Sequence, residues 1–248
     1  ELPYDSFLEE ADGLKAYILE KDYNEIAVNQ ICSSLDAKIE FTVSNVKEEN
    51  WNTTWESDFQ PIIVGDSCGI RADFHEPLDM KFEIIITPKM SFGTGHHATT
   101  FLLIGQMLKI DFSAKRILDI GCGTAVLSIL AEKLGAADIQ AIDIDEWAYN
   151  NALENLEMNS CKNIQIKIGG AEQIKGQFDG ILANINRNVL LNDIPVYSSF
   201  LKSGGFIFLS GFYTEDFPLI QSRAFEEGLE FIQYTTKDNW VAVQFVKR

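Results

Sequence analysis

Short apolar runs alternate with stretches of helical periodicity along most of the chain. Around Ile117–Gly135 an apolar run leads into a glycine-rich turn and then a helical pattern. Strands that alternate with helices in this way form a parallel sheet covered by helices on both faces. The pattern predicts strands at Ile117–Ile120, Ile139–Ile144, Ile164–Ile168, Gly180–Ile185 and Phe206–Ser210, and helices at Phe101–Leu108, Ala125–Leu134 and Glu146–Asn159, the last capped by Asp145.

Further β-rich runs flank this alternation. Near the C-terminus, Phe231–Tyr234 and Trp240–Val246 surround Lys237-Asp238-Asn239, which predicts a hairpin that adds one antiparallel strand to the sheet. Before the alternation, short strands are expected at Ile62–Val64, Cys68–Ala72 and Phe82–Thr87. The expected fold class is α/β, with a doubly wound, mostly parallel sheet and an antiparallel C-terminal hairpin.

The first part of the chain reads as a separate, small α/β domain. Its pattern predicts a strand at Leu14–Leu19, a helix at Asn24–Leu35 and a strand at Lys38–Val46. Trp51 and Trp55, four residues apart, indicate a linker helix whose tryptophans either pack on a neighbouring domain or form a ligand site. We therefore expect an N-terminal domain at 1–49, a linker helix at 50–60 and a main domain at 61–248.

Composition and charge narrow the classes of function. The 248 residues suffice for one large or two small domains, and no apolar run approaches the ~20 residues that span a bilayer. The four cysteines form no C-x-x-C pair, which favours a reducing cytoplasm and argues against zinc. The net charge of −17 either favours a basic partner over nucleic acid or serves solubility alone. Because the chain begins at Glu1, we expect the start of its first domain to be missing.

A carboxylate at a strand end indicates a cofactor that carries a ribose. Asp143 ends a predicted strand 22 residues after Gly121, where a parallel sheet places it beside the glycine turn to accept two ribose hydroxyls. A dinucleotide fingerprint requires a third glycine where this chain has Val126, and no Gly-Lys-Ser/Thr phosphate loop is present. The segment L-D-I-G-C-G-T-A instead resembles the glycine loop of seven-strand methyltransferases that use S-adenosylmethionine, with Ala125 replacing a usual glycine.

Three motifs in order resemble the signature of the PrmA family, which methylates protein eleven of the large ribosomal subunit. That signature reads M-A-F-G-T-G-x-H-x-T-T, D-x-G-C-G-x-G-x-L-A-I, D-I-D and A-N-I. This chain has M-S-F-G-T-G-H-H-A-T-T, D-I-G-C-G-T-A-V-L-S-I, D-I-D and A-N-I, and the resemblance runs from about Trp51 to the C-terminus. Its departures are Ser91, Ala125 and Ser128, each a small residue replacing another.

The resemblance implies a cytoplasmic enzyme that transfers methyl groups from S-adenosylmethionine to amino groups of a basic ribosomal protein. The expected partner is this ribosomal protein, bound by residues 1–49, and no direct nucleic-acid binding, no membrane and no metal are expected. Asn184 is expected to orient the amine as the catalytic residue. The implied cofactor-binding residues are Thr100, Gly121, Gly123, Asp143, Asn184, Asp119 and Phe92.

Several assignments keep alternatives. Asp119 holds the methionine ammonium or only forms the turn, and Thr100 binds the carboxylate of the methionine or only starts a helix. His96 and His97 lack a third metal ligand and are expected to line a flexible lip at Ser91–His97. Trp147 or Tyr149 contacts the adenine or packs the helix. Two rival functions remain: a methyltransferase for a small molecule or another protein, and a binding module without catalysis.

Overall fold

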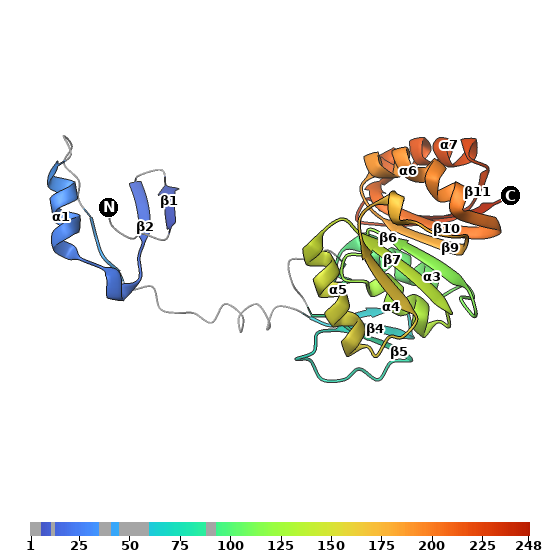
Figure 1. The fold of residues 1–248 in the computed structure, drawn as a ribbon, viewed down its shortest axis with the longest axis horizontal. Coiled ribbons are helices and arrows are strands. Elements are labelled where there is room, and N and C mark those ends of the chain that lie inside the picture. The colour runs from blue at the N-terminus through green and yellow to red at the C-terminus, as the bar shows by residue number, and fades with distance from the viewer. Residues whose placement is uncertain (1–5, 11–12, 35–40, 45–59, 88–92) are drawn as a thin grey trace. The chain divides into compact units, whose positions relative to one another are not determined.

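The computed structural model describes residues 6–10, 13–34, 41–44, 60–87 and 93–248. The chain divides into two compact units, Glu1–Thr54 and Trp55–Arg248. The first contains an antiparallel hairpin of β1 (Ser6–Glu10) and β2 (Gly13–Tyr17), the short turn η1 (Glu20–Asp22) and helix α1 (Glu25–Ser34) (Figure 1). The strand and the helix expected around β2 and α1 are confirmed, whereas β1 was not predicted.

Two other expectations for this region have different outcomes. The strand expected at Lys38–Val46 is wrong for residues 41–44, where the backbone forms no strand. The linker helix with Trp51 and Trp55 lies outside the described residues. The domain boundaries 1–49, 50–60 and 61–248 therefore stay a prediction.

A seven-stranded sheet forms the centre of the second unit. Its spatial order is β11-β12-β10-β9-β6-β7-β8, and the five strands from β10 to β8 run parallel. Strand β12 pairs antiparallel with both β10 and β11, as expected for the C-terminal hairpin. The bounds are β6 (Arg116–Ile120), β7 (Asp138–Asp143), β8 (Ile164–Ile168), β9 (Phe178–Asn184), β10 (Leu201–Tyr213), β11 (Leu229–Lys237) and β12 (Trp240–Lys247).

Alternating side chains of this sheet enter two separate apolar cores. Ile117 joins the core with α3 (Ala98–Met107), α4 (Val126–Lys133) and α5 (Glu146–Met158), whereas its neighbour Leu118 faces the other core. The second core is closed by α6 (Arg187–Phe200) and α7 (Phe217–Glu226), on the opposite face of the sheet (Figure 1). The doubly wound α/β fold is confirmed. No helix in the described ranges has the length and apolarity needed to cross a membrane.

Helices α6 and α7 were not predicted, and in α6 the sequence itself is a weak helix former. Helix α6 contains Pro195 and several Asn, Asp and Ser residues, which have low helix propensity. Its buried side chains Leu190, Ile194 and Tyr197 pack against the sheet, so tertiary contacts supply what propensity lacks. Short 3-10 turns, η2 (Ala171–Gln173) and η3 (Thr214–Asp216), precede β9 and α7.

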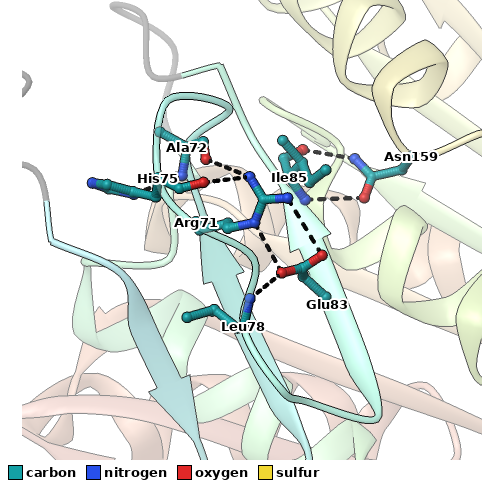
Figure 2. A network of polar contacts seen from close by, with 7 residues as sticks. All are labelled: Arg71, Ala72, His75, Leu78, Glu83, Ile85 and Asn159. Carbon is teal, nitrogen blue, oxygen red and sulfur yellow. Dashed lines mark hydrogen bonds and ion pairs between the residues drawn. The ribbon is translucent and has the colours of Figure 1, made fainter.

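A smaller sheet covers the outer side of α4. It contains β3 (Ile62–Val64), β4 (Cys68–Arg71) and β5 (Phe82–Ile85), all three predicted, with β4 antiparallel to β3 and parallel to β5. Buried Arg71 donates to Glu83 at 2.8 Å and to the carbonyls of Ala72 and His75, so it holds the loop between β4 and β5 (Figure 2). Arg71 also lowers the pKa of the Glu83 carboxyl, chiefly by its hydrogen bond.

Candidate cofactor site

The glycine turn, residues 121–124, follows β6 directly. Its two glycines adopt the left-handed backbone conformation that favours this residue type. Gly121 has φ +68° and Gly123 has φ +54°. The N–H groups of Gly121 and Cys122 both donate to the Ile142 carbonyl, at 2.8 and 3.1 Å, which fastens the turn to β7. Ala125, where the resemblance expects glycine, has φ +63° and is fully buried. Alanine at this position therefore carries backbone strain that the usual glycine avoids.

Asp143 ends β7 directly beside this turn. Its Oδ2 atom accepts the Gly123 N–H at 2.8 Å, and its Oδ1 atom accepts the Asp145 N–H at 3.0 Å. Each carboxylate oxygen keeps a second lone pair, and the side chain is half-buried at the carboxyl edge of the sheet. Asp145 caps α5 by accepting the Trp147 N–H at 2.8 Å, as predicted. The structure thus brings the carboxylate and the glycine turn together.

Asp119 is a buried carboxyl group beneath the turn. It is 1% exposed, and its Oδ2 atom accepts a 2.6 Å hydrogen bond from the Ser128 hydroxyl in the first turn of α4. Burial raises the pKa of Asp119 from 3.8 to about 7, with a smaller rise from the Asp143 charge, while Ser128 opposes the shift. The pKa of the Cys122 thiol is likewise raised well above 9.0 by burial, so this thiol stays protonated.

A second polar pair lies at the same edge of the sheet. Asn184 ends β9, the neighbour of β6, and its Nδ2 atom donates to the Thr100 hydroxyl at 3.2 Å. Thr100 is fully buried in the first turn of α3. The Oδ1 atom of Asn184 is buried and accepts no hydrogen bond from the described residues. A buried acceptor without a donor is costly in a folded protein, so this atom is suited to a bound ligand.

The lip expected at Ser91–His97 is described only from Gly93 onward, so Phe92 and Ser91 lie outside the described residues. His96 contacts the Thr94 hydroxyl at 3.2 Å and the Gln60 carbonyl at 3.0 Å. His97 caps α3 through Thr99 and packs its ring edge-on to Trp240, 4.7 Å between centroids. In the described ranges no three potential metal ligands lie together.

Sequence reasoning missed three neighbours of the site, which are Ile185, Gly211 and Ser128. A side chain on Gly121 would lie 2.2 Å from the Ile185 Cγ2 atom, and one on Gly211 would lie 2.1 Å from the Ile185 carbonyl oxygen. Ile185 therefore packs between the glycine turn and β10 and aligns the end of β9 beside them. Ser128, the third neighbour, carries the hydroxyl that contacts Asp119. The A-N-I motif was the available signal for Ile185.

Replacing Gly121 with alanine is expected to destabilise the protein by more than about 2 kcal/mol. Left-handed backbone costs a non-glycine residue about 1–2 kcal/mol, and the new methyl group also overlaps Ile185. Gly204→Ala is the matched control, because Gly204 has φ +75° and open space around it. Urea unfolding of both variants measures the difference. Equal losses of stability would show that Ile185 yields without cost.

Comparisons with known proteins agree with this geometry. The family model described as "Ribosomal protein L11 methyltransferase (PrmA)" matches residues 3–248. A Phocaeicola vulgatus protein named ribosomal protein L11 methyltransferase is 42% identical over 255 residues, covering 100% of this chain and 91% of the relative. One of the same name from Porphyromonas gingivalis is 47% identical over 201 residues, covering 79% and 69%.

Two solved structures are also similar to this chain. A crystal structure titled ribosomal protein L11 methylase, from Lactobacillus delbrueckii subsp. bulgaricus, matches with a TM-score of 0.71 and 26% identity. That match covers 77% of this chain and 100% of the other. A Pyrococcus furiosus methyltransferase, 21% identical with a TM-score of 0.51, covers 57% of this chain and 79% of its own and shares the fold. The resemblance in the sequence is confirmed: this chain belongs to the ribosomal protein L11 methyltransferase (PrmA) family.

Proposed function

We propose that the chain transfers methyl groups from S-adenosylmethionine to amino groups of ribosomal protein L11, with lysine side chains as the acceptors and the N-terminal amine as a further candidate. Family membership and the relatives' names support the methyl acceptor. The observation that carries the proposal is the contact between the Asp143 carboxylate and the Gly123 N–H at the carboxyl edge of a methyltransferase sheet. In parallel α/β sheets, ligands bind at this edge.

The residues at this edge fit each part of the proposed cofactor. Asp143 would accept the two ribose hydroxyls, and the backbone of the turn at Gly121 and Gly123 would lie against the cofactor. Asp119 would oppose the ammonium of the methionine part, and Thr100 lies in the first turn of α3, where an anion is favoured. Asn184 would receive a donor on its unpartnered Oδ1 atom. Phe92 stays a proposed contact from the sequence.

The chemistry requires alignment more than activation. When bound, S-adenosylmethionine would supply an already activated methyl group on its sulfonium. The substrate amine would form the new N–C bond in line as the C–S bond breaks, and S-adenosylhomocysteine would leave. Asn184 would orient that amine by accepting one of its N–H groups, so that the nitrogen lone pair faces the methyl carbon. A free lysine has a pKa of ~10.4 and must lose a proton first, which removal from water assists. We assign no general base.

Residues 1–49 are proposed to bind the ribosomal protein. The second unit, Trp55–Arg248, is proposed to bind S-adenosylmethionine independently. A chain that starts at Trp55 should keep its cofactor affinity and lose most activity on L11. Calorimetry and transfer of labelled methyl groups measure the two properties, and circular dichroism checks that the shortened chain folds. Methylation of L11 by the shortened chain at the full rate would contradict this recognition role.

Charge should guide the encounter with a basic substrate. With a net charge of −17, kcat/KM for L11 should fall as salt shortens the Debye length from ~10 Å at 0.1 M to ~3 Å at 1 M. Cofactor affinity should change little over the same range. Salt-independent kcat/KM would indicate that the acidic surface serves solubility instead.

The substrate assignment is tested with labelled cofactor and a whole ribosomal-protein extract. One labelled band that comigrates with L11 supports the proposal. If only small amines, RNA or other proteins became labelled, one of these would be the substrate in place of L11. Cofactor binding without methyl transfer would indicate a non-catalytic module.

All four cysteines are free in the described part of the chain. The cytoplasmic location stays a prediction.

A further inference from the structure

Helix α5 pairs with the edge of β5 through a row of asparagines. Asn151, Asn155 and Asn159 are four residues apart, so they lie along one face of the helix. Asn159 accepts the Ile85 N–H at 3.0 Å and donates to its carbonyl at 2.6 Å, as a neighbouring strand does (Figure 2). One turn earlier, Asn155 accepts the Thr87 N–H at 2.9 Å, and Asn151 donates to the Thr87 carbonyl at 3.3 Å.

Asn155 differs from Asn159 because it also reaches the glycine turn. Its Nδ2 atom donates to the Thr124 carbonyl at 2.9 Å, and both residues are fully buried. The Thr124 hydroxyl donates in turn to the Gly93 carbonyl at 2.7 Å. Thr87 and Gly93 flank residues 88–92 of the chain. Both flanks are therefore tied to the same turn, one through Asn155 and the other through Thr124.

We propose that Asn155 is a positioning residue that fixes the glycine turn relative to Thr87 and Gly93, and that cofactor affinity depends on it. This inference rests on the proposed function. Neither Asn155 nor Thr124 belongs to the proposed cofactor contacts, so their effect is indirect. Buried hydrogen bonds of this kind hold a site rigid, because breaking one leaves polar groups without partners in a water-poor interior.

The packing of Gly93 supports the same arrangement. Gly93 has φ +104°, and a side chain there would lie 2.9 Å from the Thr124 Oγ1 atom. The backbone of Gly93 thus approaches the glycine turn more closely than any other residue type allows. At this close contact, the Thr124 hydroxyl donates its hydrogen bond to the Gly93 carbonyl.

The test compares Asn155→Ala with Asn159→Ala, and the probe is S-adenosylhomocysteine measured by calorimetry. Both variants lose a contact to the β5 segment, so both should lower the melting temperature. Only Asn155→Ala should also raise the Kd, by about tenfold, the effect of losing one buried hydrogen-bonded link. Asn159→Ala should bind as the wild type does. Equal melting shifts with unchanged Kd in both variants would overturn the proposal.

A second pair of variants keeps the test decisive if Asn155→Ala fails to fold. Thr124→Val removes the hydroxyl that binds Gly93 at nearly constant volume, and Thr124→Ser retains it. The valine variant should raise the Kd several-fold, and the serine variant should restore it. Wild-type affinity in the valine variant would overturn the inference alone. No binding by the wild-type chain would overturn the proposed function and this inference together.

Discussion

Replacing Asp143 with alanine is expected to weaken S-adenosylmethionine binding about 30-fold or more. Two ribose hydroxyls that donate to a charged acceptor contribute roughly 1.5–3 kcal/mol each, and together about 2–4 kcal/mol because they are not additive. The loss of acceptors for the Gly123 and Asp145 N–H groups adds to this effect, because these bonds order the turn. Calorimetry on the full chain measures the change.

Asp145→Ala is the control for this experiment. Asp145 lies two residues away and caps α5 through the Trp147 N–H, so its loss should cost about 1 kcal/mol of stability and leave the affinity unchanged. Asp143→Asn should give an intermediate affinity, since an amide keeps one acceptor oxygen without the charge. Wild-type affinity in a folded Asp143→Ala protein would remove Asp143 from the site.

Replacing Asp119 with asparagine is expected to stabilise the cofactor-free protein at pH 8 and weaken cofactor binding. Burial raises the pKa of this carboxyl from 3.8 to about 7, so the folded protein holds the proton more tightly than the unfolded chain. Its contribution to stability is complete below pH 3.8 and is lost as pH rises through about 7. The shift corresponds to a penalty on the order of 4 kcal/mol above pH 7, which asparagine avoids while still accepting from Ser128.

Urea unfolding from pH 4.5 to pH 8 separates this group from others. Burial lowers the pKa of His97, and hydrogen bonds lower the pKa of Glu83, so these groups give the opposite slope as pH falls. The contributions of His97 and Glu83 cancel when the free energy of unfolding of Asp119→Asn is subtracted from that of the wild type at each pH. That difference should grow steadily between about pH 4 and 7, and a constant difference would show that Asp119 ionises normally. Cofactor affinity in the same variant tests its role opposite the ammonium.

Elements with regular local patterns were predictable because each pattern follows from a single physical cause. Ile117 and Leu118 face different cores because successive strand side chains point to opposite faces. The Asp238-Asn239 turn has φ values of +50° and +66°, which a two-residue hairpin loop requires and these residue types tolerate. Such features depend on neighbours along the chain, and the sequence displays those neighbours directly.

The candidate site was predictable in part for the same reason. Strand ends of a parallel sheet meet at one edge, so Asp143 and Asn184 had to lie near the glycine turn. Their individual partners were not predictable. That Ser128 contacts Asp119 depends on the first turn of α4 lying against the end of β6, and a serine in a helix otherwise carries no such information.

By itself, the sequence determined the α/β class, the glycine turn and the strand-end carboxylate, because periodicity and turn chemistry act over a few residues. Only the tertiary structure decided that Asn155 joins two segments, since its partners Thr87 and Thr124 lie 68 and 31 residues away. It also decided that Asp119 titrates near neutral pH, because burial is a property of the packed interior. Helix α6 forms for a related reason: the apolar face of the sheet stabilises residues that would not form a helix alone.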